Sequence, residues 1–235
     1  MTDYLSSHQG HVLDLLLHHL TLCAVALGVS FAIALPLGIL ISRYAALYTP
    51  VLSAFGAIYT IPSLALLALL VPTFGLNATT ALIALVLYAQ FILLRNIVTG
   101  LRGVDAALLE AARGMGMSPL QVLWRVELPL ALPVIVAGIR IATVTVIAVT
   151  TIATYIGVST LGDLLSEGGN RYPTGIGEIE AGGLALGVLA IGADLLLRAI
   201  EWAATRSASG AGGPAVNPRR AADVAPPQVV GAQRS

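Results

Sequence analysis

Long uninterrupted apolar segments constrain the fold of this chain more than any other feature of its sequence. Five of them approach the ~20 residues that a helix needs to cross the hydrocarbon core of a bilayer. They lie at about residues 20–41, 53–71, 79–94, 131–156 and 180–200. Only 10% of the residues are charged, against about 25% in a soluble domain. We therefore expect an all-α integral membrane protein of about five transmembrane helices, embedded in the lipid bilayer.

The fifth apolar segment is the weakest of these predictions, because Asp194 and Arg198 lie within it. Both charges fall near one end of the segment, where long side chains reach the membrane interface. Their i,i+4 spacing also places them on one helix face, where they can pair. We therefore retain residues 180–200 as a span.

The arginines are distributed unevenly between the predicted loops, and their distribution predicts the orientation, because cytoplasmic loops carry an excess of basic residues. Arg43 follows the first span, and Arg95, Arg102, Arg113 and Arg125 follow the third. Arg198 lies at the end of the fifth span, and Arg206, Arg219, Arg220 and Arg234 follow it. Between the predicted spans on the opposite side there is only Arg171. This pattern predicts an extracytoplasmic N-terminal segment at residues 1–17, a transmembrane domain at residues 18–204 and a cytoplasmic C-terminus.

The C-terminal segment differs in composition from the rest of the chain. Residues 205–235 are mostly Ala, Gly, Pro, Ser and Arg, without hydrophobic periodicity. Such a composition cannot bury enough apolar surface to fold. We expect a disordered cytoplasmic tail and no second folded domain.

A polar insert at residues 104–129 separates the third and fourth spans, on the predicted cytoplasmic side. Its apolar residues recur at helical spacing, and Gly114 and Gly116 then interrupt the helix. Ser118 and Gln121 follow with the spacing of a capping box. We expect two short helices at the membrane surface, the second ended by Leu128 and Pro129, where the chain turns back into the membrane.

Small residues at Ala111 and Ala112 give the first of these helices a face that permits close approach by another surface. Periodicity alone does not decide between such a docking element and an amphipathic connector that lies on the lipid. The spacing of the residues is compatible with both interpretations.

Several chemical functions find no support in the sequence. The net charge is zero, which argues against nucleic acid as a partner. There is no Lys, so the phosphate-binding loop of an ATPase is excluded. Four histidines, His8, His11, His18 and His19, cluster near the N-terminus, but no Cys or carboxylate group completes a metal site. Cys23 is the only cysteine and lies in an apolar run, so we expect it to be a packing residue. We expect a non-enzymatic chain without cofactor or metal.

The insert resembles the EAA loop of permease subunits of ABC importers. Glu110-Ala111-Ala112 is followed by three residues, Gly116, nine residues, Val126, one residue and Leu128-Pro129, which meets every spacing of that motif. The resemblance implies a type I ABC importer permease fold. It also implies that this loop, with Met115 beside Gly116, is a coupling helix that docks into a groove of the ATPase subunit.

Other stretches resemble the osmoprotectant branch of the same family, which imports glycine betaine, choline, carnitine or proline betaine. They are Tyr59–Leu67, with Ser63 inside it, Pro133–Ile147 and Tyr155–Asp163. The last departs from its relatives, which often carry a Gly-rich run where Ser159 and Thr160 stand. The resemblance implies a bacterial inner-membrane location. It also implies ABC ATPase subunits, a second permease subunit in a homo- or heterodimer and a separate extracytoplasmic solute-binding protein as partners.

Five residues are candidates for the transport pathway: Tyr59, Pro62, Ser63, Arg140 and Thr143. An aromatic ring such as that of Tyr59 attracts quaternary ammonium groups. Pro62 introduces either a gating kink or a packing kink. A charge at Arg140 is by default functional, unless it reaches the interface or pairs with a carboxylate such as Asp194. The hydroxyl of Thr143 either lines a pore or serves helix packing, and we favour packing for most threonines of this span.

Three alternatives remain at this stage. A permease for methionine or another amino acid would carry the same loop. A secondary carrier would need mid-membrane ionisable residues and usually internal repeats, and only Arg140 is clearly intramembrane. A membrane-embedded enzyme would need an acidic or His cluster at one interface, which the sequence lacks.

Overall fold

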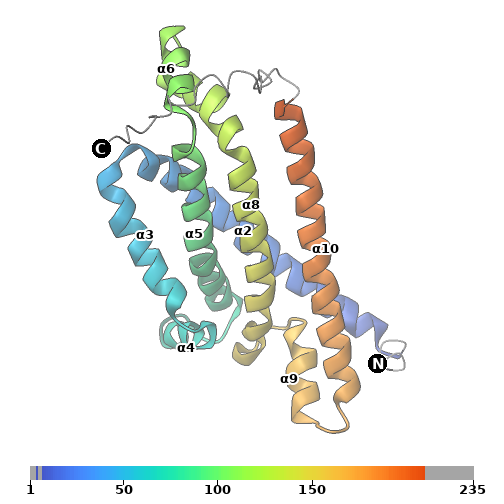
Figure 1. The fold of residues 1–235 in the computed structure, drawn as a ribbon. Helices are drawn as coiled ribbons and strands as arrows, with labels where there is room; N and C mark the ends of the chain where they lie inside the picture. The colour runs from blue at the N-terminus through green and yellow to red at the C-terminus, as the bar shows by residue number, and fades with distance from the viewer. Residues whose placement is uncertain (1–3, 5–6, 210–235) are drawn as a thin grey trace, which may run out of the picture.

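The computed structural model describes residue 4 and residues 7–209. Every regular element in these residues is helical. Figure 1 shows elongated helices packed side by side, with short helices at both ends of the bundle. In chain order the elements are α2 (Gln9–Arg43), α3 (Ala45–Thr60), α4 (Ser63–Phe74), α5 (Ala78–Arg102), α6 (Ala106–Gly114), α7 (Pro119–Val122), the π-helix η1 (Leu123–Glu127), α8 (Leu128–Thr150), the 3₁₀-helix η2 (Thr151–Ile156), α9 (Gly162–Asn170) and α10 (Ile176–Ser209).

The predicted membrane spans are present as long apolar helices. Within the described residues, four single stretches are long and apolar enough to cross a bilayer, namely α2, α5, the continuous segment Pro119–Ile156 and residues Ile176–Trp202 of α10. Together, α3 and α4 are also long and apolar enough, but they meet at a sharp bend, as in a broken span or a re-entrant loop. The prediction of an all-α chain with about five transmembrane helices is therefore confirmed.

The second span is broken where the sequence predicted only a kink. The axes of α3 and α4 differ by 99°. Ile61 and Pro62 both have extended backbone, with ψ of 128° and 136°. A residue before proline is driven out of the helical region by the proline ring, and proline itself has no N–H to donate. The Tyr88 hydroxyl donates to the carbonyl oxygen of Ile61, which compensates for a lost helical hydrogen bond.

The central helix α5 extends further than the sequence predicted. Its expected range was 79–94, but the helix continues to Arg102. Arg95 and Asn96 therefore lie within an apolar helix, whereas the sequence placed Arg95 in the following loop. Polar residues near the end of a span resemble a loop in composition, and this caused the misplacement.

Two glycines allow neighbouring helices to approach α5 closely. A Cβ atom at Gly38 of α2 would lie 2.5 Å from Ile97 Cγ2, and one at Gly138 of α8 would lie 2.4 Å from Asn96 Cβ. Small residues at helix crossings are a common packing device in membranes, where close contact replaces the hydrophobic drive. The contacts hold α5 between α2 and α8.

The molecule has two distinct ends. α6 and the C-terminal end of α10 lie at one end, and α4 and α9 lie at the other (Figure 1). The end with α6 is the one that the arginine distribution assigns to the cytoplasm. The helix α10 continues to Ser209, five residues past the predicted domain limit of 204. The rest of the predicted tail, residues 210–235, lies outside the described part of the chain.

Candidate functional site

The polar insert forms the projection at one end of the bundle, and its first helix is capped as its sequence requires. Asp105 is the N-cap of α6, and its Oδ1 accepts the Ala107 N–H at 2.9 Å. The helix ends at Gly114. Gly116 then has φ of +80°, and no atom lies within 4 Å of the position of its missing Cβ. Backbone conformation, rather than lack of space, therefore requires glycine at this position.

The second helix begins with the predicted capping box. The Gln121 N–H donates to Ser118 Oγ at 3.4 Å, and the Ser118 N–H donates to Gln121 Oε1 at 2.8 Å. Pro119 occupies the first turn, where its lack of an N–H costs no hydrogen bond. The two short helices and the glycine break between them were predicted correctly.

The expected helix end at Leu128 and Pro129 is wrong. α7 leads directly into the π-helix η1, and η1 leads into α8 without a loop. Pro129 is the second residue of α8. A proline removes one donor and crowds the preceding turn, and the wider π turn before it accommodates both effects while the chain stays helical. The insert is therefore joined rigidly to the fourth span.

The small residues of the insert do not share one exposed face. Ala112 is 2% exposed and packs inside the chain, so it is not a contact surface for a partner. Ala111 and Glu110 are exposed. The predicted small-residue face is therefore half wrong: Ala112 allows α6 to pack against its own chain, and Ala111 faces outward.

Large apolar side chains occupy the outer surface of the insert instead. Met115 is 72% exposed and Leu120 is 65% exposed. Leu108 and Trp124 are exposed as well. We call these four residues the apolar coupling patch. Exposed apolar side chains that lie together mark a contact with another protein or with the membrane. The sequence placed Leu108, Leu120 and Trp124 on the two short helices, but only Met115 was predicted to contact the ATPase.

A partly buried ion pair ties the base of the insert to the first span. Arg43 Nη1 donates to Glu127 Oε1 at 2.9 Å, and Nη2 donates to Oε2 at 2.6 Å. Glu127 is 3% exposed and belongs to η1, while Arg43 ends α2. Nearby, Arg102 of α5 donates to the Ile41 carbonyl oxygen at 3.1 Å. These contacts were not predicted, although Arg43 and Glu127 were both visible as charges beside predicted spans on the same side of the membrane.

Arg140 pairs with carboxylates of α10. Its Nε lies 3.3 Å from Asp194 Oδ1, and its Nη1 lies 3.0 Å from Glu201 Oε2. Asp194 also accepts a hydrogen bond from Arg198 Nε at 2.7 Å, as the i,i+4 spacing predicted. Asp194 was the suggested partner of Arg140, and Glu201 was missed. The hydroxyl of Thr143 donates to the Ile139 carbonyl oxygen of its own helix.

The other pathway candidates cluster at the broken span. Tyr59 is in the last turn of α3, Pro62 lies at the break and Ser63 begins α4. Tyr59 lines a cavity of about 460 Å³ on the surface of α5, together with Phe91 and Arg95.

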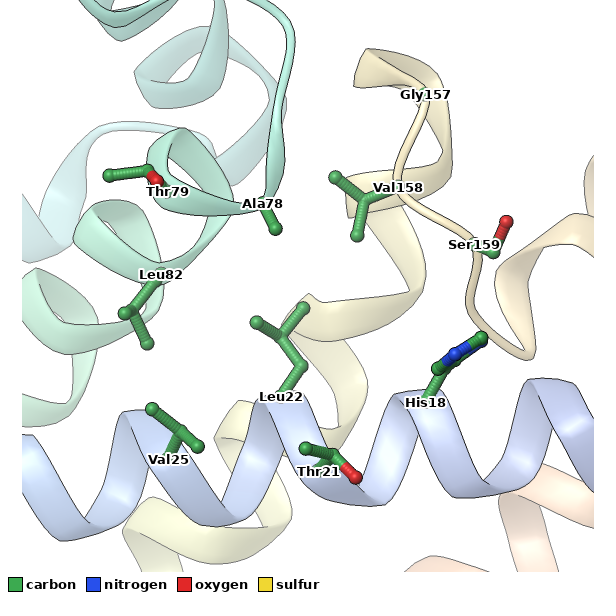
Figure 2. A pocket seen from close by; sticks show the side chains of 10 residues that line it. All are labelled: His18, Thr21, Leu22, Val25, Ala78, Thr79, Leu82, Gly157, Val158 and Ser159. Atoms are coloured by element: carbon green, nitrogen blue, oxygen red, sulfur yellow. The ribbon is translucent and has the colours of Figure 1, made fainter.

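A second cavity, of about 490 Å³, lies at the end opposite α6 (Figure 2). α2 forms its floor, and the start of α5 and the loop Gly157–Ser159 form its walls. In Figure 2 the Leu22 side chain points between Ala78 and Val158, and His18 lies on the side of Ser159. The lining is mostly apolar with a few polar groups, which is the usual composition of a small-molecule site.

The N-terminal histidines are not assembled for metal binding. The described residues contain no group of three or more His, Cys, Asp or Glu side chains able to hold a metal ion. The ring of His8 stacks on Tyr4 at 4.4 Å between centroids, and His19 is buried.

Comparison with solved structures identifies the class of fold. The chain matches inward-facing structures of the MetNI methionine ABC transporter with a TM-score of 0.73 at 23% identity, covering 82% of this chain and 95% of the matched chain. An amino acid ABC transporter solved with histidines matches with a TM-score of 0.68 at 22% identity, over 84% of this chain and 95% of the matched chain. The fold is that of a type I ABC importer permease.

Residues 21–204 match the family described as binding-protein-dependent transport system inner membrane component. The chain belongs to this family, and it is a multi-pass protein of the inner membrane.

Its relatives include three permeases with related cargo. The choline transport system permease protein OpuBD of Bacillus subtilis (strain 168) is 39% identical, covering 86% of this chain and 89% of the relative. The carnitine transport permease protein OpuCD of Listeria monocytogenes is 40% identical, covering 86% and 90%. The osmoprotectant import permease protein OsmW of Salmonella typhimurium (strain LT2) is 41% identical, covering 84% and 94%.

Proposed function

We propose that this chain is the pore-forming subunit of an ATP-driven importer of osmoprotectants of the glycine betaine, choline, carnitine and proline betaine class. The observation that carries the proposal is the projecting insert with the apolar coupling patch, on a chain about 40% identical to permeases named for such solutes. The insert offers a surface on which an ATPase subunit can bind, and the names of the relatives indicate the class of transported solute.

The motor is a separate ABC ATPase subunit that receives the insert in a groove. The coupling residues are Glu110, Ala111, Met115 and Gly116, with Leu128 and Pro129 at the junction to α8. Ala112 acts indirectly, because it packs α6 against its own chain. The patch supplies the apolar centre of the contact, and Glu110 and Arg113 supply exposed charges around it.

Movement of the insert is transmitted to the membrane domain along two rigid connections. The first is the unbroken helix from α7 through η1 to α8. The second is the Arg43–Glu127 ion pair, which links η1 to the end of α2. Closure of the two ATPase subunits on ATP therefore moves the spans as a rigid body and switches the pore between inward- and outward-facing states.

Two further partners complete the transporter. A second permease subunit, identical or homologous, forms the other half of the pore. A separate extracytoplasmic solute-binding protein delivers the cargo to the end opposite the insert, where the cavity of Figure 2 lies.

The pathway candidates divide into two groups. Tyr59, Pro62 and Ser63 lie at the break between α3 and α4, beside a cavity, and we assign them to the pathway. Arg140 binds two carboxylates of α10, and Thr143 bonds within its own helix. We assign these two residues to helix packing.

Reconstitution tests the proposal. The chain is co-purified with candidate ATPase and binding-protein subunits and placed in proteoliposomes, and ATP-driven uptake of labelled glycine betaine, carnitine, choline, proline betaine and methionine is measured. We expect ATP-driven uptake of at least one of the quaternary ammonium solutes. Preferential methionine uptake would identify an amino-acid permease instead, and uptake driven by an ion gradient without ATP would identify a secondary carrier.

A further inference from the structure

The cavity beside Tyr59 combines aromatic and polar groups on the surface of a predicted membrane span. It has a volume of about 460 Å³, within the usual range for small-molecule sites. Residues of α3, α5 and α8 line it: Tyr59, Phe91, Ile92, Arg95, Asn96, Thr99 and Ile141. Three polar side chains on the surface of an apolar span are costly against lipid, so they indicate a water-filled cavity or a pathway.

Two aromatic rings line the cavity. The centroids of Tyr59 and Phe91 are 5.2 Å apart, with the ring planes inclined at 33°. Tyr88 packs edge-on against Tyr59 at 5.7 Å, and its hydroxyl binds the Ile61 carbonyl oxygen. The position of Tyr59 is thereby fixed from α5. A quaternary ammonium group binds favourably against such ring faces.

An arginine lies next to these rings on the same helix face. Phe91, Arg95 and Thr99 are spaced i, i+4 and i+8 along α5, so they form one stripe. Side chains of a helix lean toward its N-terminus, which directs Arg95 toward Phe91. Arg95 is exposed. Within the described residues it has no carboxylate within 4 Å, in contrast to Arg43, Arg140, Arg171 and Arg198.

We infer that this cavity is a solute-binding site within the permease for a zwitterion that carries a quaternary ammonium group and a carboxylate. The ammonium lies against Tyr59 and Phe91, and the carboxylate binds the guanidinium of Arg95. Thr99 is a further donor, as is the second N–H of the Asn96 amide, whose nitrogen also donates to the Ile92 carbonyl oxygen at 2.8 Å. This inference rests on the proposed function and adds to it a selectivity inside the membrane domain, independent of the binding protein.

The site distinguishes zwitterions from plain cations. Glycine betaine and carnitine satisfy both the aromatic pair and the arginine. Choline has no carboxylate, so it leaves Arg95 without a partner, and its positive charge is repelled by the guanidinium. An arginine left unpaired favours ligands that carry an acidic group, because hydrogen bonds between charged groups are the strong ones.

Binding to the permease without the binding protein tests the inference. The complex of permease and ATPase subunits is placed in nanodiscs without nucleotide. Saturation-transfer NMR on the N-methyl protons follows titration with glycine betaine and, separately, with choline. The variants are Arg95→Gln, Arg95→Lys and Phe91→Leu, each checked by its thermal midpoint and its basal ATPase activity.

We expect the wild-type complex to bind glycine betaine more tightly than choline. Arg95→Gln should weaken glycine betaine binding about tenfold and leave choline binding unchanged or stronger. Arg95→Lys should retain most of the preference, and Phe91→Leu should weaken both ligands alike. The inference is overturned if the wild-type complex binds neither ligand, or if Arg95→Gln leaves glycine betaine binding unchanged or weakens both equally. ATP-driven uptake by the complete transporter would persist in those cases, so the proposed function would survive.

Discussion

The guanidinium of Arg43 binds both carboxylate oxygens of Glu127, 84 residues further along the chain. The pair joins the end of the first span to the π turn at the base of the insert. Two parallel hydrogen bonds fix the relative orientation of both groups as well as their distance. A force applied to the insert therefore reaches α2 as well as α8.

The two halves of this pair differ in burial, so their removal should differ in cost. Glu127 is 3% exposed, and Arg43 is 39% exposed. Arg43→Gln leaves a buried carboxylate unpaired and should lower the free energy of unfolding by about 3 kcal/mol. Glu127→Gln leaves a half-exposed arginine that water can reach, and should cost about 1 kcal/mol. Thermal unfolding of the purified protein in detergent measures both, and a larger loss for Glu127→Gln would contradict the assignment.

Two glycines of the insert form a matched pair for testing its backbone. Both positions have open space for a Cβ atom, but only Gly116 has a positive φ. Gly116→Ala should cost roughly 1–2 kcal/mol and reduce ATP-driven uptake, because it disturbs the angle between α6 and α7. Gly114→Ala, at the end of α6, should leave stability unchanged or raise it by up to about 1 kcal/mol. Equal effects of the two substitutions on stability and uptake would show that the left-handed turn is unimportant.

The apolar coupling patch should contribute to ATPase association. Leu120→Ala removes an exposed apolar side chain from the patch and should weaken co-purification of the ATPase subunit by about tenfold. Leu76→Ala is the control. Leu76 is similarly exposed (67%, against 65% for Leu120), but it lies between α4 and α5, at the end of the molecule opposite the insert. A pull-down titration measures both variants. The patch has no docking role if Leu120→Ala binds the ATPase as the wild type does.

The arginines paired with Asp194 should differ in importance. Arg140 connects α8 to two carboxylates of α10, so Arg140→Gln leaves Asp194 and Glu201 without their bridge between helices. We expect it to lower the thermal midpoint by several degrees. Arg198 is 60% exposed and pairs within its own helix, so Arg198→Gln should cost only a few tenths of a kcal/mol. Similar thermal midpoints for the two variants would show that Arg140 does not stabilise the packing of α8 against α10.

Sequence patterns within one or two helical turns predicted the helices, the helix cap and the ion pair within one helix correctly. The apolar segments became helices, and Ser118, Pro119 and Gln121 formed the predicted cap. These features depend on neighbours within one or two turns, which the sequence displays directly. The i,i+4 pair of Asp194 and Arg198 belongs to the same class.

Features that depend on contacts between helices were not predictable to the same degree. The Arg140–Glu201 pair joins two spans, and no periodicity indicates it. The sequence predicted that Ala112 is exposed, but other residues of the same chain bury it in the folded structure. At the prolines, sequence shows that a helical donor is lost, but the surroundings decide the result: a 99° break at Pro62, and an uninterrupted helix through a π turn at Pro129.

Site-specific crosslinking tests the central claim most directly, namely that the insert is the surface on which the ATPase acts. Cys23 is buried, so a cysteine introduced at an exposed position reacts selectively. Met115→Cys and, as a control, Leu76→Cys are combined with a bifunctional reagent in the assembled transporter. We expect Met115→Cys to crosslink to the ATPase subunit and Leu76→Cys not to do so. A crosslink to the ATPase from Leu76→Cys alone would contradict the claim.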